Sequence, residues 1–161
     1  MFRIISGGQA GVDRAALDFA VAHGVAYGGW CPKDGWAEDM PDPPGLLTRY
    51  PLLRETPSSD PSERTEWNVR DSDATLILSP ADATSPGTDF TIRCTKKYRK
   101  PLLIAAPNPE ASALINVWLG DQKNLANLNI AGPRESEVPG IYGAITALLV
   151  MLFSNITSDA V

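Results

Sequence analysis

Cysteine and histidine are scarce in this sequence, with two cysteines and one histidine among 161 residues. Cys31 and Cys94 lie far apart along the chain, which predicts reduced thiols in a cytoplasmic protein. Cys31 has no second cysteine or histidine near it to complete a metal site, and the sole histidine, His23, falls at the end of an expected helix. A buried, small apolar side chain is therefore a better interpretation of Cys31 than a metal ligand or a nucleophile.

Long apolar runs and an excess of positive charge are missing as well. No window reaches the roughly 18 apolar residues that a membrane span needs. Arg3 leads directly into the first apolar segment, which leaves no room for a signal peptide. The chain carries 14 lysines and arginines against 19 acids, for a net charge of −5. We therefore expect neither a membrane nor a nucleic acid as partner, whereas local backbone donors can still hold a small anion.

The pattern that is present is an alternation of apolar, strand-like segments with segments of helical period. Strands are expected at residues 2–5, 25–31, 50–56, 74–79, 101–105 and 125–131. Helices are expected at residues 12–23, 61–72, 88–98, 110–119 and 139–154. With 43% hydrophobic residues, the chain fits a single domain, residues 1–161. The order predicts a Rossmann-like three-layer α/β/α sandwich with a predominantly parallel sheet.

Two segments depart from that regular alternation. The six prolines from Pro32 to Pro57 exclude a regular helix before Pro61 and predict a long, functional loop. The last expected helix, 139–154, is apolar on nearly every side, which suggests a subunit interface as well as a core. We expect a lysine at Leu149 or Leu152 to dissociate such an oligomer.

The first strand ends in a glycine turn that opens the first helix. Gly7, Gly8, Gln9 and Gly11 are candidates for a phosphate- or oxyanion-binding turn, because the first N–H groups of a helix have no partner within it. The spacing differs from the dinucleotide fingerprint G-x-G-x-x-G. A plain connection between strand and helix is the alternative.

Further candidates follow the carboxyl ends of later strands, where α/β proteins bind ligands. Gly87 and Thr88 open the third helix and offer a second set of backbone donors. Arg134 is a candidate anion clamp, and Ser136 a candidate hydrogen-bond donor.

Three more side chains are candidates for the same site. Lys33 follows the second strand closely enough to reach a ligand, although a solvated loop lysine is equally compatible. Arg64 and Asn68 are the pair on the second helix that we expect to point inward, whereas most charges on a helix are solvated.

Five sequence blocks together resemble the molybdenum carrier family, over nearly the whole chain. They are ISGGQAGVDRAALD (5–18), GGWCPK (28–33), RET (54–56), RTEWNVRDSD (64–73) and AGPRESEVPGIY (131–142). This Rossmann-like family is related to the "lonely guy" nucleoside-monophosphate phosphoribohydrolases. The resemblance implies a homo-oligomer, dimer or tetramer, that binds the molybdenum cofactor (molybdopterin) or a related nucleotide as ligand.

One departure from the related hydrolases bears on activity. Their second turn, P-G-G-x-G-T-x-x-E, carries a glutamate that acts in cleaving the N-glycosidic bond, and Thr91 stands at that position here. A hydroxyl cannot act as a carboxylate acid/base at neutral pH. The sequence therefore favours a binding or carrier protein for a phosphorylated ligand. The alternative is a nucleotide-processing hydrolase, for which the candidate acids are Asp13, Glu66, Asp89 and Glu135.

Overall fold

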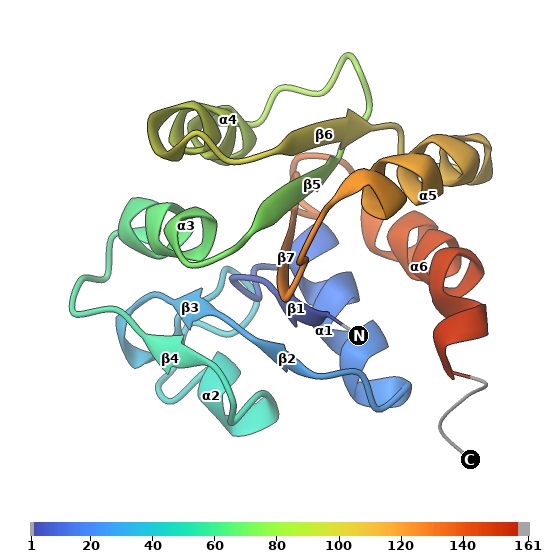
Figure 1. Ribbon diagram of the computed structural model, residues 1–161. Coiled ribbons are helices and arrows are strands. Elements are labelled where there is room, and N and C mark those ends of the chain that lie inside the picture. Colours follow the sequence, from blue (N-terminus) through green and yellow to red (C-terminus); the bar gives the residue numbers. More distant parts are fainter. Residues whose placement is uncertain (1, 158–161) are drawn as a thin grey trace.

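The computed structural model describes residues 2–157 and contains a five-stranded, fully parallel sheet between two layers of helices (Figure 1). The strands of this sheet are β1 (Arg3–Ile5), β2 (Tyr27–Gly28), β5 (Ala74–Leu78), β6 (Leu102–Ala105) and β7 (Asn127–Ala131). The principal helices are α1 (Val12–Ala22), α3 (Pro61–Arg70), α4 (Pro86–Tyr98), α5 (Ser112–Asp121) and α6 (Ile141–Thr157). The Rossmann-like α/β architecture expected from the sequence is confirmed.

The strand order in the sheet is β2-β1-β7-β5-β6, so the last strand of the chain lies between β1 and β5. The glycine turns after β1 and β5 therefore follow strands that are not neighbours. If β7 and α6 preceded β1, the strand order would become 3-2-1-4-5, as in the first five strands of a Rossmann fold. The chain therefore has the connectivity of a circular permutation of that fold, and the order of its strands changes direction between β7 and β5.

One face of the sheet carries the main apolar core. Helices α1, α5 and α6 cover this face (Figure 1), and their buried side chains pack on the strand residues that point toward them, such as Ile4, Leu76 and Ile130. The burial of all five residues of β5 fits a central parallel strand. Among residues 2–157, no helix combines the length and the apolar character needed to cross a membrane.

Helices α3 and α4 lie on the other face, where many buried side chains are polar. Thr65 and Asn68 on α3, Thr91 on α4 and Asn129 on β7 line one small recess there. The side chain of Asn129 donates to Thr75 Oγ1 over 3.3 Å. This layer is therefore held by hydrogen bonds as well as by apolar contacts.

The segment between β2 and α3 differs from the expectation in three places. The strand expected at 25–31 is broken at Gly29, whose φ of 132° and close approach to Ser6 suit glycine. Its second half is β3 (Trp30–Cys31), which pairs in parallel with β4 (Arg54–Glu55), the only strand within the expected 50–56. The proline-rich stretch holds one turn of 3-10 helix, η1 (Lys33–Gly35), and a short helix, α2 (Leu46–Arg49).

A second, smaller core holds this segment against α1. Cys31, Ala37, Leu46 and Tyr50 are fully buried there against Leu17 of α1. Burial raises the pKa of the Cys31 thiol to about 11, so the thiol stays protonated at neutral pH. Cys31 is thus a buried side chain of this core, as predicted, and both cysteines are free thiols.

The ends of the helices agree with the sequence signals in several cases. Asp60 caps α3 by accepting a hydrogen bond from Ser62 N, and Pro61 is the first helical residue. Helix α4 begins two residues earlier than expected, because Ser85 caps it. A 3-10 turn, η2 (Pro109–Ala111), precedes α5.

The last helix buries one face. Ile145, Leu149 and Leu152 belong to the core, whereas Val150 and Met151 are 41% and 49% exposed. The expectation that Leu149 and Leu152 face a partner subunit is therefore wrong. Among residues 141–153, the large apolar side chains of α6 that are exposed are Val150 and Met151.

Candidate functional site

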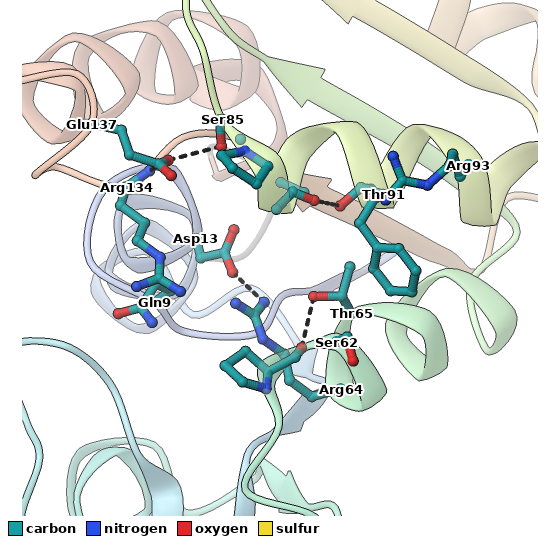
Figure 2. A pocket seen from close by; sticks show the side chains of 16 residues that line it. Gln9, Asp13, Ser62, Arg64, Thr65, Ser85, Thr91, Arg93, Arg134 and Glu137 are labelled. Carbon is teal, nitrogen blue, oxygen red and sulfur yellow. Dashed lines mark hydrogen bonds and ion pairs between the residues drawn. The ribbon is translucent and has the colours of Figure 1, made fainter.

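A cavity of about 330 Å³ opens at the carboxyl edge of the sheet, where the strand order changes direction between β7 and β5 (Figure 2). The first turns of α1, α3 and α4 and the loop after β7 form its walls. Its lining residues are Gln9, Asp13, Pro61, Ser62, Arg64, Thr65, Ser85, Pro86, Gly87, Phe90, Thr91, Arg93, Ala131, Gly132, Arg134 and Glu137. Such a crevice is where open α/β sheets bind ligands.

Asp13 and Arg64 form an ion pair in this wall, with 2.9 Å between Arg64 Nη1 and Asp13 Oδ2. Their side chains are only 6% and 12% exposed. Burial raises the pKa of the Asp13 carboxyl, and this effect outweighs the lowering by Arg64. The N–H groups of Gly7 and Gln9 also lower this pKa, so donors of the glycine turn face the chain's own carboxylate.

Arg64 retains donor capacity toward the interior. Its Nε is buried and has no hydrogen-bond partner in the part of the chain that the structure describes. Gly7 lies directly beside the guanidinium, since a Cβ at residue 7 would overlap it. The small recess that contains Gly7 and Arg64 also holds Asn68 and Thr91.

The other two glycines of the turn, Gly8 and Gly11, allow other parts of the chain to pack closely against the turn. Gly8, with φ of 76°, packs on Leu46 and Leu17, and Gly11, with φ of 100°, packs on the backbone of residues 133–135. Neither glycine lines the cavity. Of the four residues predicted in this turn, Gln9 reaches the cavity and Gly7 reaches the recess beside it.

The first turn of α4 is organised by its cap. Ser85 Oγ accepts hydrogen bonds from Thr88 N and Thr88 Oγ1 and donates one to Glu137 over 2.8 Å. Glu137 also accepts from the backbone N–H of Arg134 over 2.9 Å. The donors of Thr88 are thus used within the helix, whereas Gly87 lines the cavity.

Arg134 and Arg93 bring positive charge to the rim. Arg134 lies 3.5 Å from Glu38 and 5.9 Å from the centroid of the Trp36 ring. Arg93 is exposed, and its guanidinium lies 5.4 Å from the centroid of the Phe90 ring. Figure 2 shows Arg93 and Arg134 on opposite sides of Asp13.

Besides the residues of the two helix-opening turns, three further predicted residues lie outside the cavity. Lys33 is exposed on η1, and its backbone N–H donates to Ser58 O. Ser136 is exposed and donates to Glu38 over 2.9 Å. Asn68 points inward, as expected, but its amide bonds the backbone N–H and C=O of Trp30, which joins α3 to β3.

Phe90, Arg93 and Glu137 are lining residues that the sequence analysis missed. A signal for the first two was available, since positions 87, 90 and 93 follow one another at three-residue spacing on one helix. Glu137 offered no local signal, because its approach to Ser85 depends on the neighbouring positions of β5 and β7.

Only one of the four acids considered for hydrolysis, Asp13, lines the cavity. Glu66 binds Lys97 and Tyr98 at the surface. Glu135 accepts from the backbone of Gly140 and Tyr142 at the start of α6. Within residues 2–157, no three histidine, cysteine or acidic side chains are grouped closely enough to hold a metal ion.

Comparisons with known proteins are consistent with this fold. The model of the family described as "Circularly permutated YpsA SLOG family" matches residues 4–153. The crystal structure of the "Putative molybdenum carrier protein" of Syntrophus aciditrophicus SB is 44% identical to this chain and covers 94% of each chain, with a TM-score of 0.85. No curated protein gives a significant match.

Proposed function

Because this chain belongs to the circularly permutated YpsA SLOG family, we propose that it is a carrier that binds a phosphorylated small molecule without cleaving it. The proposed ligand is the molybdenum cofactor, a phosphorylated pterin, or a related nucleotide. The proposed site is the cavity between β5 and β7. The similar structure from Syntrophus aciditrophicus, named as a molybdenum carrier, supports a molybdenum-related ligand.

The observation that carries the proposal is that three arginines and three helix N-termini surround one cavity, beside two acids, Asp13 and Glu137. The first turns of α1, α3 and α4 contribute to the lining, as do Arg64, Arg93 and Arg134. A helix N-terminus attracts anions through its dipole, and this attraction persists where a side chain caps the helix, as Asp60 caps α3 and Ser85 caps α4. Arginine adds a planar set of donors that suits phosphate. A chain with a net charge of −5 thus presents a local site suited to an anion.

The remaining lining suits the rest of such a ligand. The volume of about 330 Å³ lies within the range of small-molecule sites. Phe90 provides an apolar surface for a flat ring, and the hydroxyls of Ser62, Thr65 and Thr91 provide polar contacts.

The residue at the hydrolases' glutamate position favours binding over hydrolysis. Thr91 lines the cavity, and its hydroxyl donates to Gly87 O over 3.0 Å. A general acid or base typically contributes a factor of about 10²–10⁴ to the rate, and a threonine cannot supply it. The hydrolase remains the second candidate because two carboxyl groups, those of Asp13 and Glu137, line the cavity.

The test is titration calorimetry with AMP, GMP and inorganic phosphate. We expect Arg93→Gln to weaken nucleotide binding about tenfold, or about 1.4 kcal/mol, because it removes a guanidinium from the lining. Lys96→Gln is the matched control, since it removes one charge from the exposed surface of the same helix, outside the cavity. Equal affinities of the two variants, or no binding by the wild type, would contradict the proposed site.

The same nucleotide panel separates the carrier from the hydrolase. We expect no free base above background after prolonged incubation. Base release that is lost in Asp13→Asn would make the protein an enzyme. Native mass spectrometry with metal analysis, on protein from a host that makes the cofactor, tests for bound molybdenum.

We further propose a cytoplasmic homo-oligomer, a dimer or tetramer. Support for an oligomer comes from large apolar side chains exposed on neighbouring helices, namely Leu114 and Val117 on α5 and Val150 and Met151 on α6. The free thiols of both cysteines agree with a reducing compartment.

A further inference from the structure

A second cavity, of about 420 Å³, lies over β1 and β2, on the side of the sheet that carries α3. It shares no lining residue with the ligand cavity. The ligand cavity contacts the first turn of α3 at Pro61, whereas the second cavity contacts the C-cap of the same helix, Asp71. A helix of 10 residues is about 15 Å long, so the two cavities are separate.

One wall of this second cavity is an arginine held by an aromatic ring. The guanidinium of Arg54 lies 4.1 Å from the centroid of the Trp30 ring. That ring is itself fixed, because its Nε1 donates to Asp71 over 2.8 Å and Trp67 packs edge-on against it at 4.7 Å. Stacking engages the face of a guanidinium and leaves its N–H edge available to an anion.

A second arginine enters the cavity from the first strand. Arg3 begins β1, and its stem crosses Gly28, where a Cβ would lie 3.6 Å from Arg3 Cδ. No carboxylate of the described side chains lies within 4.0 Å of the charged groups of Arg3 or Arg54. The two cations are therefore positioned by packing rather than by ion pairs.

The one acid in the lining is already bound. Asp71 accepts from Arg70 Nε at 2.7 Å and Arg70 Nη2 at 2.9 Å, in addition to the indole of Trp30. These contacts, chiefly those with Arg70, lower the pKa of the Asp71 carboxyl. Asp71 thus stays charged and paired with Arg70, and the positive charges of Arg3 and Arg54 remain in excess.

We propose that this cavity is a second anion-binding site, distinct from the ligand cavity, which takes the phosphate or carboxylate group of a small molecule between Arg3 and Arg54. The amide of Asn127 and the backbone at Gly28 and Gly29 complete the polar lining. Leu52, 60% exposed at the rim, provides an apolar contact for the body of the molecule.

The tryptophans provide a test by ¹H–¹⁵N NMR of the indole groups, with inorganic phosphate and succinate titrated separately at constant ionic strength. Trp30 reports on the second site, Trp36 reports on the ligand cavity through Arg134, and Trp118 on α5 is a remote reference. We expect a saturable shift of the Trp30 indole with at least one of the two anions. Trp30→Phe assigns the resonance.

Variants then assign the binding to the two arginines. Arg3→Gln combined with Arg54→Gln is expected to raise the Kd at Trp30 at least tenfold. Both side chains are exposed, so we expect the double variant to fold. If it does not fold, Arg54→Gln alone provides the same test. Lys96→Gln controls for net charge, and Arg93→Gln is expected to leave the Trp30 titration unchanged.

Three results would overturn the second site. They are a Trp30 shift that does not saturate, a shift that sodium chloride reproduces, and a shift that survives the loss of both arginines. A saturable shift at Trp36 alone would support the ligand cavity and refute the second site.

Discussion

Asp13 is the residue on which the electrostatics of the ligand cavity depend most directly. Its carboxylate pairs with Arg64 and faces N–H groups of the glycine turn, which are the groups expected to hold a ligand's phosphate. A ligand anion must therefore share these donors with Asp13 or bind beside it, at Arg64 and the first turns of α3 and α4. This carboxylate limits how strongly the site attracts an anion.

Replacing Asp13 with asparagine tests this arrangement. The change leaves the charge of Arg64 nearly buried and uncompensated, so we expect a loss of about 3 kcal/mol in the free energy of unfolding. Phosphate should restore part of this stability, because it can pair with Arg64 in place of the carboxylate. Urea unfolding with and without phosphate measures both effects.

Asp89→Asn is the control for that substitution. Asp89 is exposed on α4 and outside the lining, so its replacement should change neither stability nor the response to phosphate. If Asp13→Asn unfolds like the wild type and phosphate stabilises both proteins equally, the ion pair of Asp13 and Arg64 has no role in the site.

Helix α6 packs one face on the core and exposes apolar side chains on another face. Its spacing places Ile141, Ile145, Leu148 and Leu149 on the buried face. Val150 lies on the opposite side, 41% exposed. The two faces predict opposite outcomes for a charged substitution.

Substitutions on the two faces separate folding from assembly. Leu149→Lys should unfold the protein, because it buries a charge in the core. If α6 forms the proposed subunit contact, Val150→Glu should leave the circular dichroism spectrum intact and lower the mass measured by sedimentation. Ile104→Glu, at an exposed position on the edge strand β6, is the control.

A wild-type protein that sediments as a monomer at micromolar concentration would contradict the proposed oligomer. An unchanged mass for Val150→Glu would show that α6 is not part of the interface, but it would not contradict the oligomer itself.

At the scale of the whole molecule, the place of β7 in the sheet differs from its place in the chain. Strand β7 and helix α6 end the chain, yet β7 pairs with both β1 and β5. Near the two ends of the described chain, the rings of Phe2 and Phe153 pack edge-on with their centroids 5.4 Å apart. The sheet therefore requires the contacts of β7 and not its position at the end of the sequence.

A permuted gene tests that conclusion. The new chain would begin at Lys123, in the exposed turn before β7, and a flexible linker of about 10 residues would join residue 157 to residue 2. We expect the same circular dichroism spectrum and a Tm within a few degrees of the natural chain. Failure to fold would mean that the natural order is needed for stability.

The sequence alone determined the elements and their local geometry. Asp60 and Pro61 start a helix, the apolar run at 74–78 is a buried strand, and Gly7 to Gly11 form a turn, because capping, periodicity and glycine conformation depend on neighbours within a few residues. The family resemblance agreed with the comparisons because its blocks span most of the chain.

Only the tertiary structure decided which of these elements meet. The insertion of β7 between β1 and β5 brings Glu137 to Ser85, and α3 packs across the sheet so that Arg64 reaches Asp13. The same packing brings the side chain of Asn68 to the backbone of Trp30, whose N–H donates a hydrogen bond to it. These contacts join residues 38 to 52 positions apart, and such pairings follow from strand order and layer packing, which no local pattern encodes.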